Sequence, residues 1–219
     1  MTLRRDFYHH ILPSMLAFAL SGVYAVTDGF FVGNALGDQA LAAINLAFPL
    51  TAFLQAVGTG AGMGAAVSYT LAVGSGDRER AREYFGLTAV LLPLLGLLLT
   101  LLYLAAAPPI LQLFGASGEI YGLAWEYIRF VTYGAIFQVL GTGLVPFIRN
   151  MGGSVTAMAA MIAGFGTNIL LDYLFVWRIP WGMMGAALAT ALGQAATFAV
   201  CLGFFLVKGE RPLLRWRGR

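Results

Sequence analysis

The chain has 219 residues, of which 59% are hydrophobic and 11% are charged, and its mean hydropathy is +0.80. These values exclude an ordinary soluble domain and predict an integral membrane protein. A single cysteine excludes a disulfide framework within the chain. The net charge of +3 comes with no recognisable nucleic-acid-binding module, so we expect no nucleic-acid partner.

Apolar runs follow one another along the whole chain, and each is long enough to supply the roughly 20 residues that cross about 30 Å of hydrocarbon. The second and fourth runs are longer, so we expect them to tilt or to project beyond the bilayer. We expect six membrane-spanning helices, at about 11–33, 41–73, 84–106, 120–148, 155–177 and 183–207. The polar gaps between them are too short to hold a folded domain outside the membrane. The sequence therefore predicts an all-α fold in which residues 1–219 form a single six-helix transmembrane bundle in the cell (plasma) membrane.

Lysine and arginine are distributed unevenly between the two ends of these helices. With a cytoplasmic amino terminus, eleven of the 13 basic residues fall on the inner side, and only Arg129 and Arg178 fall outside. Cytoplasmic segments of membrane proteins carry such an excess. We therefore expect both termini in the cytoplasm and the basic residues against the anionic inner leaflet. The inner set is Arg4, Arg5, Arg78, Arg80, Arg82, Arg149, Lys208, Arg211, Arg215, Arg217 and Arg219.

Two aspartates lie deep inside the apolar runs of different helices. Asp28 is 17 residues after Ile11, and Asp172 is 17 residues after Val155, in helices that both run outward, so they reach a similar depth in the outer half of the membrane. A carboxylate in hydrocarbon costs several kcal/mol unless it is protonated, paired or faces a water-filled cavity. One buried aspartate can simply join two helices, but two at one depth favour a functional site.

Asn168 and Thr190 supply further oxygen atoms near this depth. Asn168 is one turn before Asp172 on the same helical face, and Thr190 is seven residues after Met183 on the inward-running sixth helix. With Asp28, these side chains form a candidate site for Na+, or for a proton shared between two carboxylates. Gln194 lies one turn beyond Thr190. Its side chain either adds a polar contact to a substrate cavity or makes an interhelical hydrogen bond.

The glycine string Gly58–Gly64 superficially resembles a phosphate-binding loop. It follows no strand and lacks the Lys-Ser/Thr pair of a P-loop. The spacing of Gly58 with Gly62, and of Gly60 with Gly64, is typical of closely packed membrane helices. The chain also shows no Ser-His-Asp set, no metal-binding cluster and no ATPase motif, so we expect neither an enzyme nor a cofactor.

Several segments resemble the multidrug and toxic compound extrusion (MATE) family, and together they cover essentially the whole chain. The resemblance implies a secondary antiporter that expels cationic, amphipathic drugs in exchange for H+ or Na+. Its partners would be small organic cations and the lipid bilayer. The segments are Asp28–Gly37 (DGFFVGNALG), Ala40–Pro49 (ALAAINLAFP), Ile148–Gly153 (IRNMGG), Asn168–Asp172 (NILLD) and Trp181–Thr190 (WGMMGAALAT).

The resemblance also implies roles for individual residues. In similar prokaryotic transporters the amino-terminal six-helix lobe holds the ion site, and Asp28, Asn168, Asp172 and Thr190 map onto it. Tyr24, one turn before Asp28, matches a position that lines the substrate cavity. The first helix of the family is proposed to bend at the position of Pro13, where proline removes a backbone hydrogen bond.

Members of the family have twelve helices in two lobes, whereas this chain has six predicted helices. We expect either a truncated chain or an assembly with a second six-helix half or another copy, because alternating access requires two bundles to rock against each other. Two other hypotheses stay open. One is a flippase of lipid-linked sugars from the wider superfamily. Such a substrate carries a pyrophosphate, which would require several buried Arg or Lys side chains in the cavity. We expect an acidic cavity, which favours cations instead. The other is a membrane fragment that does not transport.

Overall fold

The computed structural model describes the chain from Leu3 to Lys208, apart from the side chains at positions 3–7, 9–10 and 24–25. Over that range the chain is almost entirely helical, and its elements follow one another without any strand. They are α1 (Leu3–Leu36), α2 (Asp38–Gly74), α3 (Arg78–Leu113), α4 (Gly118–Tyr133), α5 (Ala135–Asn150), α6 (Ser154–Asp172), the π-helix η1 (Tyr173–Arg178) and α7 (Gly182–Lys208).

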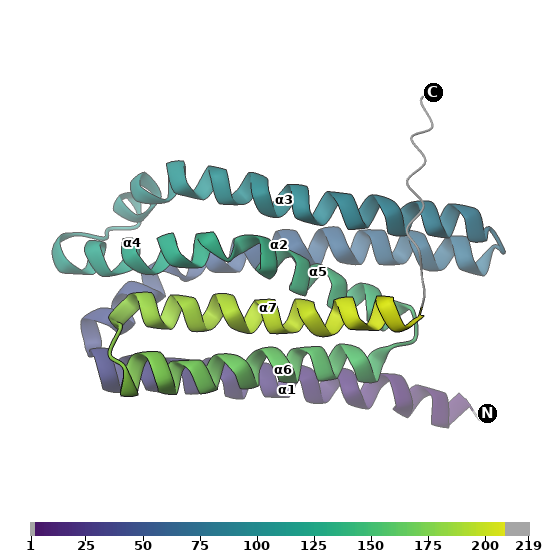
Figure 1. Cartoon of the computed structure of the whole chain (residues 1–219), viewed down its shortest axis with the longest axis horizontal. Coiled ribbons are helices and arrows are strands. Elements are labelled where there is room, and N and C mark those ends of the chain that lie inside the picture. Colours follow the sequence, from purple (N-terminus) through teal and green to yellow (C-terminus); the bar gives the residue numbers. More distant parts are fainter. Residues whose placement is uncertain (1–2, 209–219) are drawn as a thin grey trace.

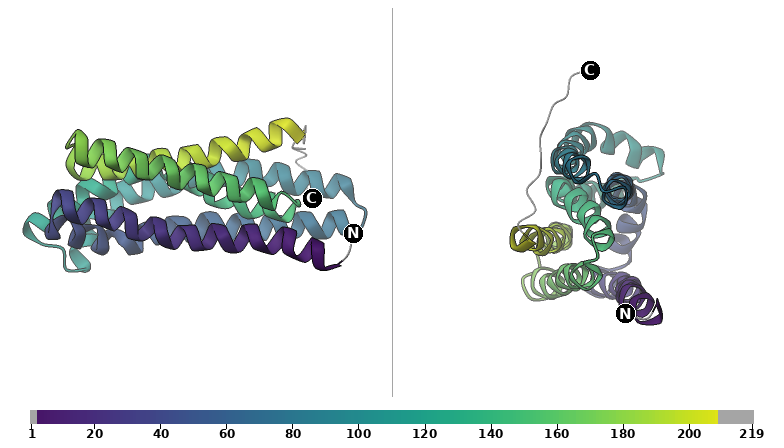
Figure 2. Two further views of the ribbon diagram at one scale, coloured as in Figure 1. Left: turned by 90° about the horizontal axis from the view of Figure 1, so that it is seen from below. Right: turned by 90° about the vertical axis from the view of Figure 1, so that its right-hand side faces the viewer.

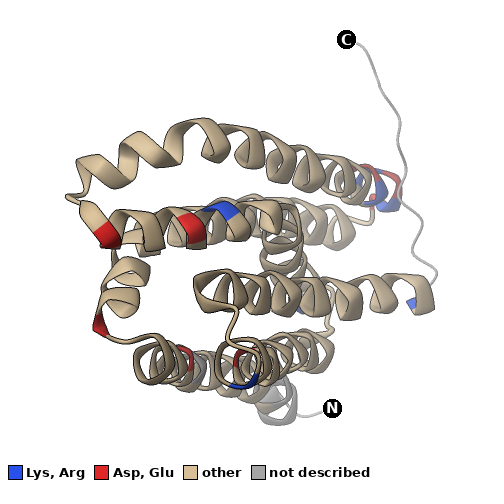
Figure 3. Cartoon of the chain, turned by 60° about the vertical axis from the view of Figure 1, so that its left-hand side comes forward, with Lys and Arg blue, Asp and Glu red and all other residues tan. Residues whose placement is uncertain are grey.

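The helices lie side by side in an elongated bundle, with α5 in its middle (Figure 1). In the described part, five helices are long and apolar enough to cross a membrane, and α4 with α5 forms a sixth as a bent pair. The predicted all-α membrane bundle is therefore confirmed. α1 begins and α7 ends at the same end as the α2–α3 turn (Figure 2), and basic residues lie at that turn and at the end of α7 (Figure 3). We refer to it as the cytoplasmic end, following the orientation predicted from the basic residues.

The expected span 120–148 is divided into two helices, α4 and α5, whose axes differ by 61°. Gly134 lies at the break, and a Cβ at this position would collide with Ala191 of α7. Glycine therefore allows α7 to approach the bend closely. A continuous apolar pattern does not reveal this bend, because the residues on both sides are equally suited to a membrane helix.

The expected span 155–177 is regular only as far as Asp172. From Tyr173 to Arg178 the chain forms a π-helix, in which each amide bonds one residue further back than in an α-helix. Short π-helical segments occur frequently at functional sites. This one directly follows the carboxylate that the sequence singles out.

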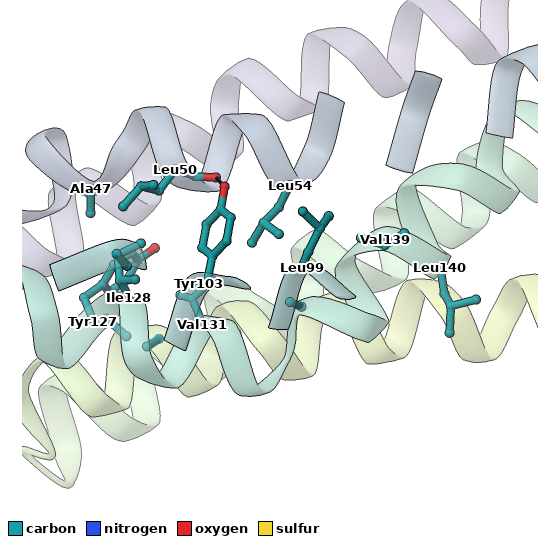
Figure 4. Packing of buried hydrophobic residues seen from close by; sticks show 14 of the residues in the cluster. Ala47, Leu50, Leu54, Leu99, Tyr103, Tyr127, Ile128, Val131, Val139 and Leu140 are labelled. Atoms are coloured by element: carbon teal, nitrogen blue, oxygen red, sulfur yellow. Dashed lines mark hydrogen bonds between the residues drawn. The ribbon is translucent and has the colours of Figure 1, made fainter. Parts of the chain in front are cut away.

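Between α2, α3 and α4, aliphatic and aromatic side chains interdigitate in a continuous core (Figure 4). Tyr103 of α3 points across this core toward α2. Its hydroxyl donates a 2.8 Å hydrogen bond to the carbonyl oxygen of Leu50, and only 4% of the side chain is exposed. A polar contact of this kind fixes the rotation of α3 against α2, which apolar contacts alone specify weakly.

Removing this hydroxyl tests its contribution to stability. We expect Tyr103→Phe to lower the free energy of unfolding by about 0.5–1 kcal/mol, the typical worth of a buried hydrogen bond between membrane helices. Tyr133→Phe is the matched control, because Tyr133 is 55% exposed. Unfolding by SDS in mixed micelles measures both variants, and equal losses would show that the contact with Leu50 contributes nothing.

The glycine string packs through one of its two predicted pairs. A Cβ on Gly62 would collide with the backbone of Gly143 in α5, and one on Gly58 would collide with the same helix. By contrast, nothing lies within 4 Å of a Cβ placed on Gly60 or Gly64. Gly58 and Gly62 therefore bring α2 against α5, while the other pair lies on a different face of α2.

Candidate ion-binding site

The two aspartates of the predicted site lie together in the bundle. The carboxyl groups of Asp28 in α1 and Asp172 in α6 are within hydrogen-bonding reach of each other. Asp172 is completely buried, and Asp28 is half-buried. An ionised carboxylate only accepts hydrogen bonds, so the pair can form one only when one of the two carries a proton. Without a proton or a cation, the site holds two like charges at close range.

Aromatic contacts hold α1 beside η1 next to this pair. The Phe31 ring lies 5.7 Å from the ring of Trp177 and 6.5 Å from that of Tyr173. Phe30 adds a contact of 6.4 Å with Trp177. Phe31 is three residues after Asp28, and Tyr173 directly follows Asp172. These contacts therefore keep the two carboxyl groups at the same height.

Asn168 and Thr190 join the pair from α6 and α7. Asn168 Nδ2 donates to Thr190 Oγ1 over 3.5 Å, and the Thr190 hydroxyl donates to the Ala186 carbonyl over 3.1 Å. The Oδ1 atom of Asn168 and both oxygen atoms of Asp172 are buried and receive no hydrogen bond from the residues that the structure describes. Buried oxygen atoms are rarely left in this state, because each loses its hydration without compensation. The site thus lacks a positive group.

Tyr127 of α4 belongs to this cluster, although it is not among the predicted site residues. Its hydroxyl lies within reach of the Thr190 side chain and near both aspartates. Only 6% of the side chain is exposed. A depth calculation could have found it, since Tyr127 follows Ile120 by seven residues in an inward-running helix, as Thr190 follows Met183. In an apolar run, however, a lone tyrosine is usually a core residue.

A cavity of about 150 Å³ lies between α1, α2, α5, α6 and α7. The structure places Gln194 in its lining, one turn along α7 from Thr190. The cavity therefore begins about 6 Å from the ion-binding residues, toward the cytoplasmic end. Its lining comprises Phe18, Gln55, Thr59, Met63, Gly141, Thr142, Val145, Pro146, Arg149, Met161, Phe165, Gln194 and Thr197.

The expectation of an acidic cavity is wrong for the residues described. Arg149 is the only charged side chain among those that line it. The guanidinium of Arg149 lies 5.4 Å from the centre of the Phe18 ring, and its Nη2 atom is 3.8 Å from Met161 Sδ. The acidic pair is a separate feature nearer the outer end. The cavity extends toward the end of α5, where Arg149 turns inward instead of reaching the interface.

Two further predicted residues belong to α1. The helix continues through Pro13 without interruption, so the proposed bending there stays a prediction. The side chain of Tyr24 lies outside the described residues, and its place in the cavity lining also stays a prediction.

Comparison with known proteins decides the family. The MatE family model matches residues 13–174, which is most of the chain. The chain belongs to the MatE family. This result confirms the resemblance found in the sequence, and it identifies a multi-pass membrane protein of a transporter family.

Relatives of this MatE chain include multidrug export protein MepA of Staphylococcus aureus (strain NCTC 8325 / PS 47). The two are 28% identical over 202 residues, which are 92% of this chain and 45% of MepA. A crystal structure of MATE in complex with MaD5 superposes with a TM-score of 0.89 at 30% identity, over 98% of this chain and 49% of that one. A MOP superfamily transporter from Pyrococcus furiosus Vc1 (DSM3638), described with a binding pocket of reverse polarity, superposes with a TM-score of 0.86 at 30% identity. The match covers 97% of this chain and 47% of that one.

The MatE chain thus spans about half the length of the relatives it matches. Its six-span bundle is equivalent to one lobe of these transporters. The superposition over nearly the whole chain confirms the predicted fold class.

Proposed function

We propose that this lobe couples the export of amphipathic, cationic compounds to the entry of H+ or Na+. The observation that supports this proposal is the buried cluster of Asp28, Asp172 and Asn168, in which three oxygen atoms receive no hydrogen bond from the described residues. A proton would permit a hydrogen bond between the carboxyl groups, whereas Na+ would take the free oxygen atoms as ligands, as hard cations do. Either ion supplies the positive group that the site lacks.

Coupling would follow from the helices that carry the ligands. Asp28 belongs to α1, while Asp172 and Asn168 belong to α6. Ion binding stabilises the arrangement in which these helices are in contact, and ion release leaves two like charges that favour their separation. Because Phe18 of α1 also lines the cavity, movement of α1 would change the cavity whenever the ion site fills or empties. A second six-helix half, or another copy, would provide the opposite wall for alternating access.

A specific observation favours a second candidate substrate class. Arg149 places a guanidinium in the cavity, where it would attract a phosphate or carboxylate group. Lipid-linked sugars carry such a group as pyrophosphate. A single arginine is fewer than the several that a pyrophosphate requires, so we retain cationic amphiphiles, which relatives named for multidrug export support.

Flux in reconstituted vesicles tests the proposal. The 219-residue chain is placed in vesicles loaded with ethidium, or with an anionic dye of similar size, under a pH gradient, a Na+ gradient or neither. We expect efflux of ethidium that accelerates with one of the two gradients. Efflux of the anionic dye alone would favour the second candidate. An ethidium efflux rate that is the same with and without either gradient would contradict ion coupling. The absence of efflux of either dye would favour a fragment that does not transport.

A further inference from the structure

Two adjoining hollows at the cytoplasmic end carry basic residues. The larger, about 540 Å³, is lined by Arg78 and Arg82 of α3, and the smaller, about 170 Å³, is lined by Lys208 of α7. Tyr69 and Val73 of α2 line both, so the hollows adjoin along that helix. None of the described side chains that line them is acidic. We call the two hollows together the head pocket.

An apolar groove of about 290 Å³ runs between α3, α5 and α7, and we call it the acyl groove. Its polar lining residue is Thr88, whose hydroxyl donates to the Tyr84 carbonyl over 2.7 Å and so needs no outside partner. α5 contributes Leu140 and Leu144 to the groove and turns Arg149 toward the interior cavity. The groove is therefore distinct from the cavity proposed for transport.

The head pocket lies one helical turn beyond the cytoplasmic end of the acyl groove, along both α3 and α7. Phe85 in the groove is three residues after Arg82, and Phe205 is three residues before Lys208. The centres of the Phe85 and Phe205 rings are 4.8 Å apart, so α3 and α7 are in contact at the cytoplasmic end of the groove. Lys208 Nζ lies 4.9 Å from the neighbouring Phe204 ring. Figure 3 shows the basic residues at the start of α3 and the end of α7 at this one end of the bundle.

We propose that the head pocket and the acyl groove together bind one anionic phospholipid of the inner leaflet. The phosphate would lie among the guanidinium and ammonium groups, where charge-assisted hydrogen bonds are strong. An acyl chain would fill the groove between α3 and α7, which a free anion would leave empty. Basic pockets between membrane helices on the cytoplasmic side suit such headgroups. The bound lipid would join α3 to α7 on the side of α5 that faces away from the cavity.

Native mass spectrometry of the 219-residue chain tests this inference, with phosphatidylglycerol and phosphatidylcholine of identical acyl chains as probes. We expect one phosphatidylglycerol to be retained per chain in preference to phosphatidylcholine. Arg82→Gln and Lys208→Gln should each weaken phosphatidylglycerol binding by about fivefold, as expected for one basic residue at an anionic surface. Arg178→Gln, which removes an exposed cation of η1 outside the head pocket, should change nothing.

The groove is tested separately with Ala89→Trp, which places a large side chain in its lining. This variant should weaken the binding of both lipids, and its SDS unfolding midpoint shows whether the bundle is intact. Equal retention of the two lipids by the unaltered chain would overturn the proposal. Phosphatidylglycerol binding that is undiminished in Arg82→Gln and Lys208→Gln would also overturn it. Binding of glycerol 3-phosphate as tightly as the lipid would identify an anion site that makes no use of the groove.

Discussion

Replacing Asp172 with asparagine should abolish the dependence of ethidium efflux on the coupling ion. Asp172 is completely buried, and both of its oxygen atoms lack a hydrogen bond from the described residues, so its charge is available to the ion. A charge pair at close range in a protein is worth up to about 4 kcal/mol, which is roughly a thousandfold in ion affinity. Asp28→Asn should have the same effect, since the two carboxyl groups face each other. Efflux rates with and without the gradient measure this loss.

Stability separates a lost ion site from a lost fold. Asparagine has nearly the shape of aspartate but no charge, so Asp172→Asn removes the like-charge repulsion with Asp28. The variant should therefore unfold in SDS at the same concentration as the unaltered chain, or at a higher one. Asp38→Asn, at the exposed start of α2, is the matched control and should leave both flux and unfolding unchanged. Full ion dependence in both Asp28→Asn and Asp172→Asn would contradict the proposed site.

Depth in the membrane explains why much of this cluster could be predicted. A helix that crosses the bilayer must cover a fixed thickness, so counting residues from its end gives the height of each side chain. Asp28, Asp172 and Thr190 lie at similar heights by this count, and the structure brings them together with Asn168. The same count places Tyr127 at that height, but height alone does not select one tyrosine among apolar neighbours.

Rotation about the helix axis explains why the rest could not be predicted. Whether a side chain faces the cavity, another helix or lipid depends on how the helices pack, and an apolar sequence carries little of that information. Arg149 illustrates the difficulty, because an arginine near a helix end is expected to extend toward the interface. The structure instead places its side chain in the lining of the cavity. The π-helix after Asp172 likewise has no signature in the composition.

Gly62→Ala should be the most destabilising small substitution in the bundle. The added Cβ would overlap the backbone of Gly143, which cannot rotate away as a side chain can, so α2 must move off α5. Overpacking of a tight interface typically costs 1–3 kcal/mol and occasionally more, and we expect a loss of at least about 3 kcal/mol here. SDS unfolding in mixed micelles measures it. The separation of α2 and α5 also shapes the cavity, because Thr59 and Thr142 line it from these two helices.

Gly64→Ala, two residues further along α2, is the matched control and should act in the opposite direction. Nothing lies within 4 Å of a Cβ at this position, so the added methyl group meets no obstacle. Alanine is the better helix former by about 1 kcal/mol, so this variant should be as stable as the unaltered chain or slightly more stable. Both substitutions add the same atoms to the same helix, so helix propensity alone predicts equal effects. Equal effects would therefore show that α2 and α5 are not in the close contact that Gly62 allows.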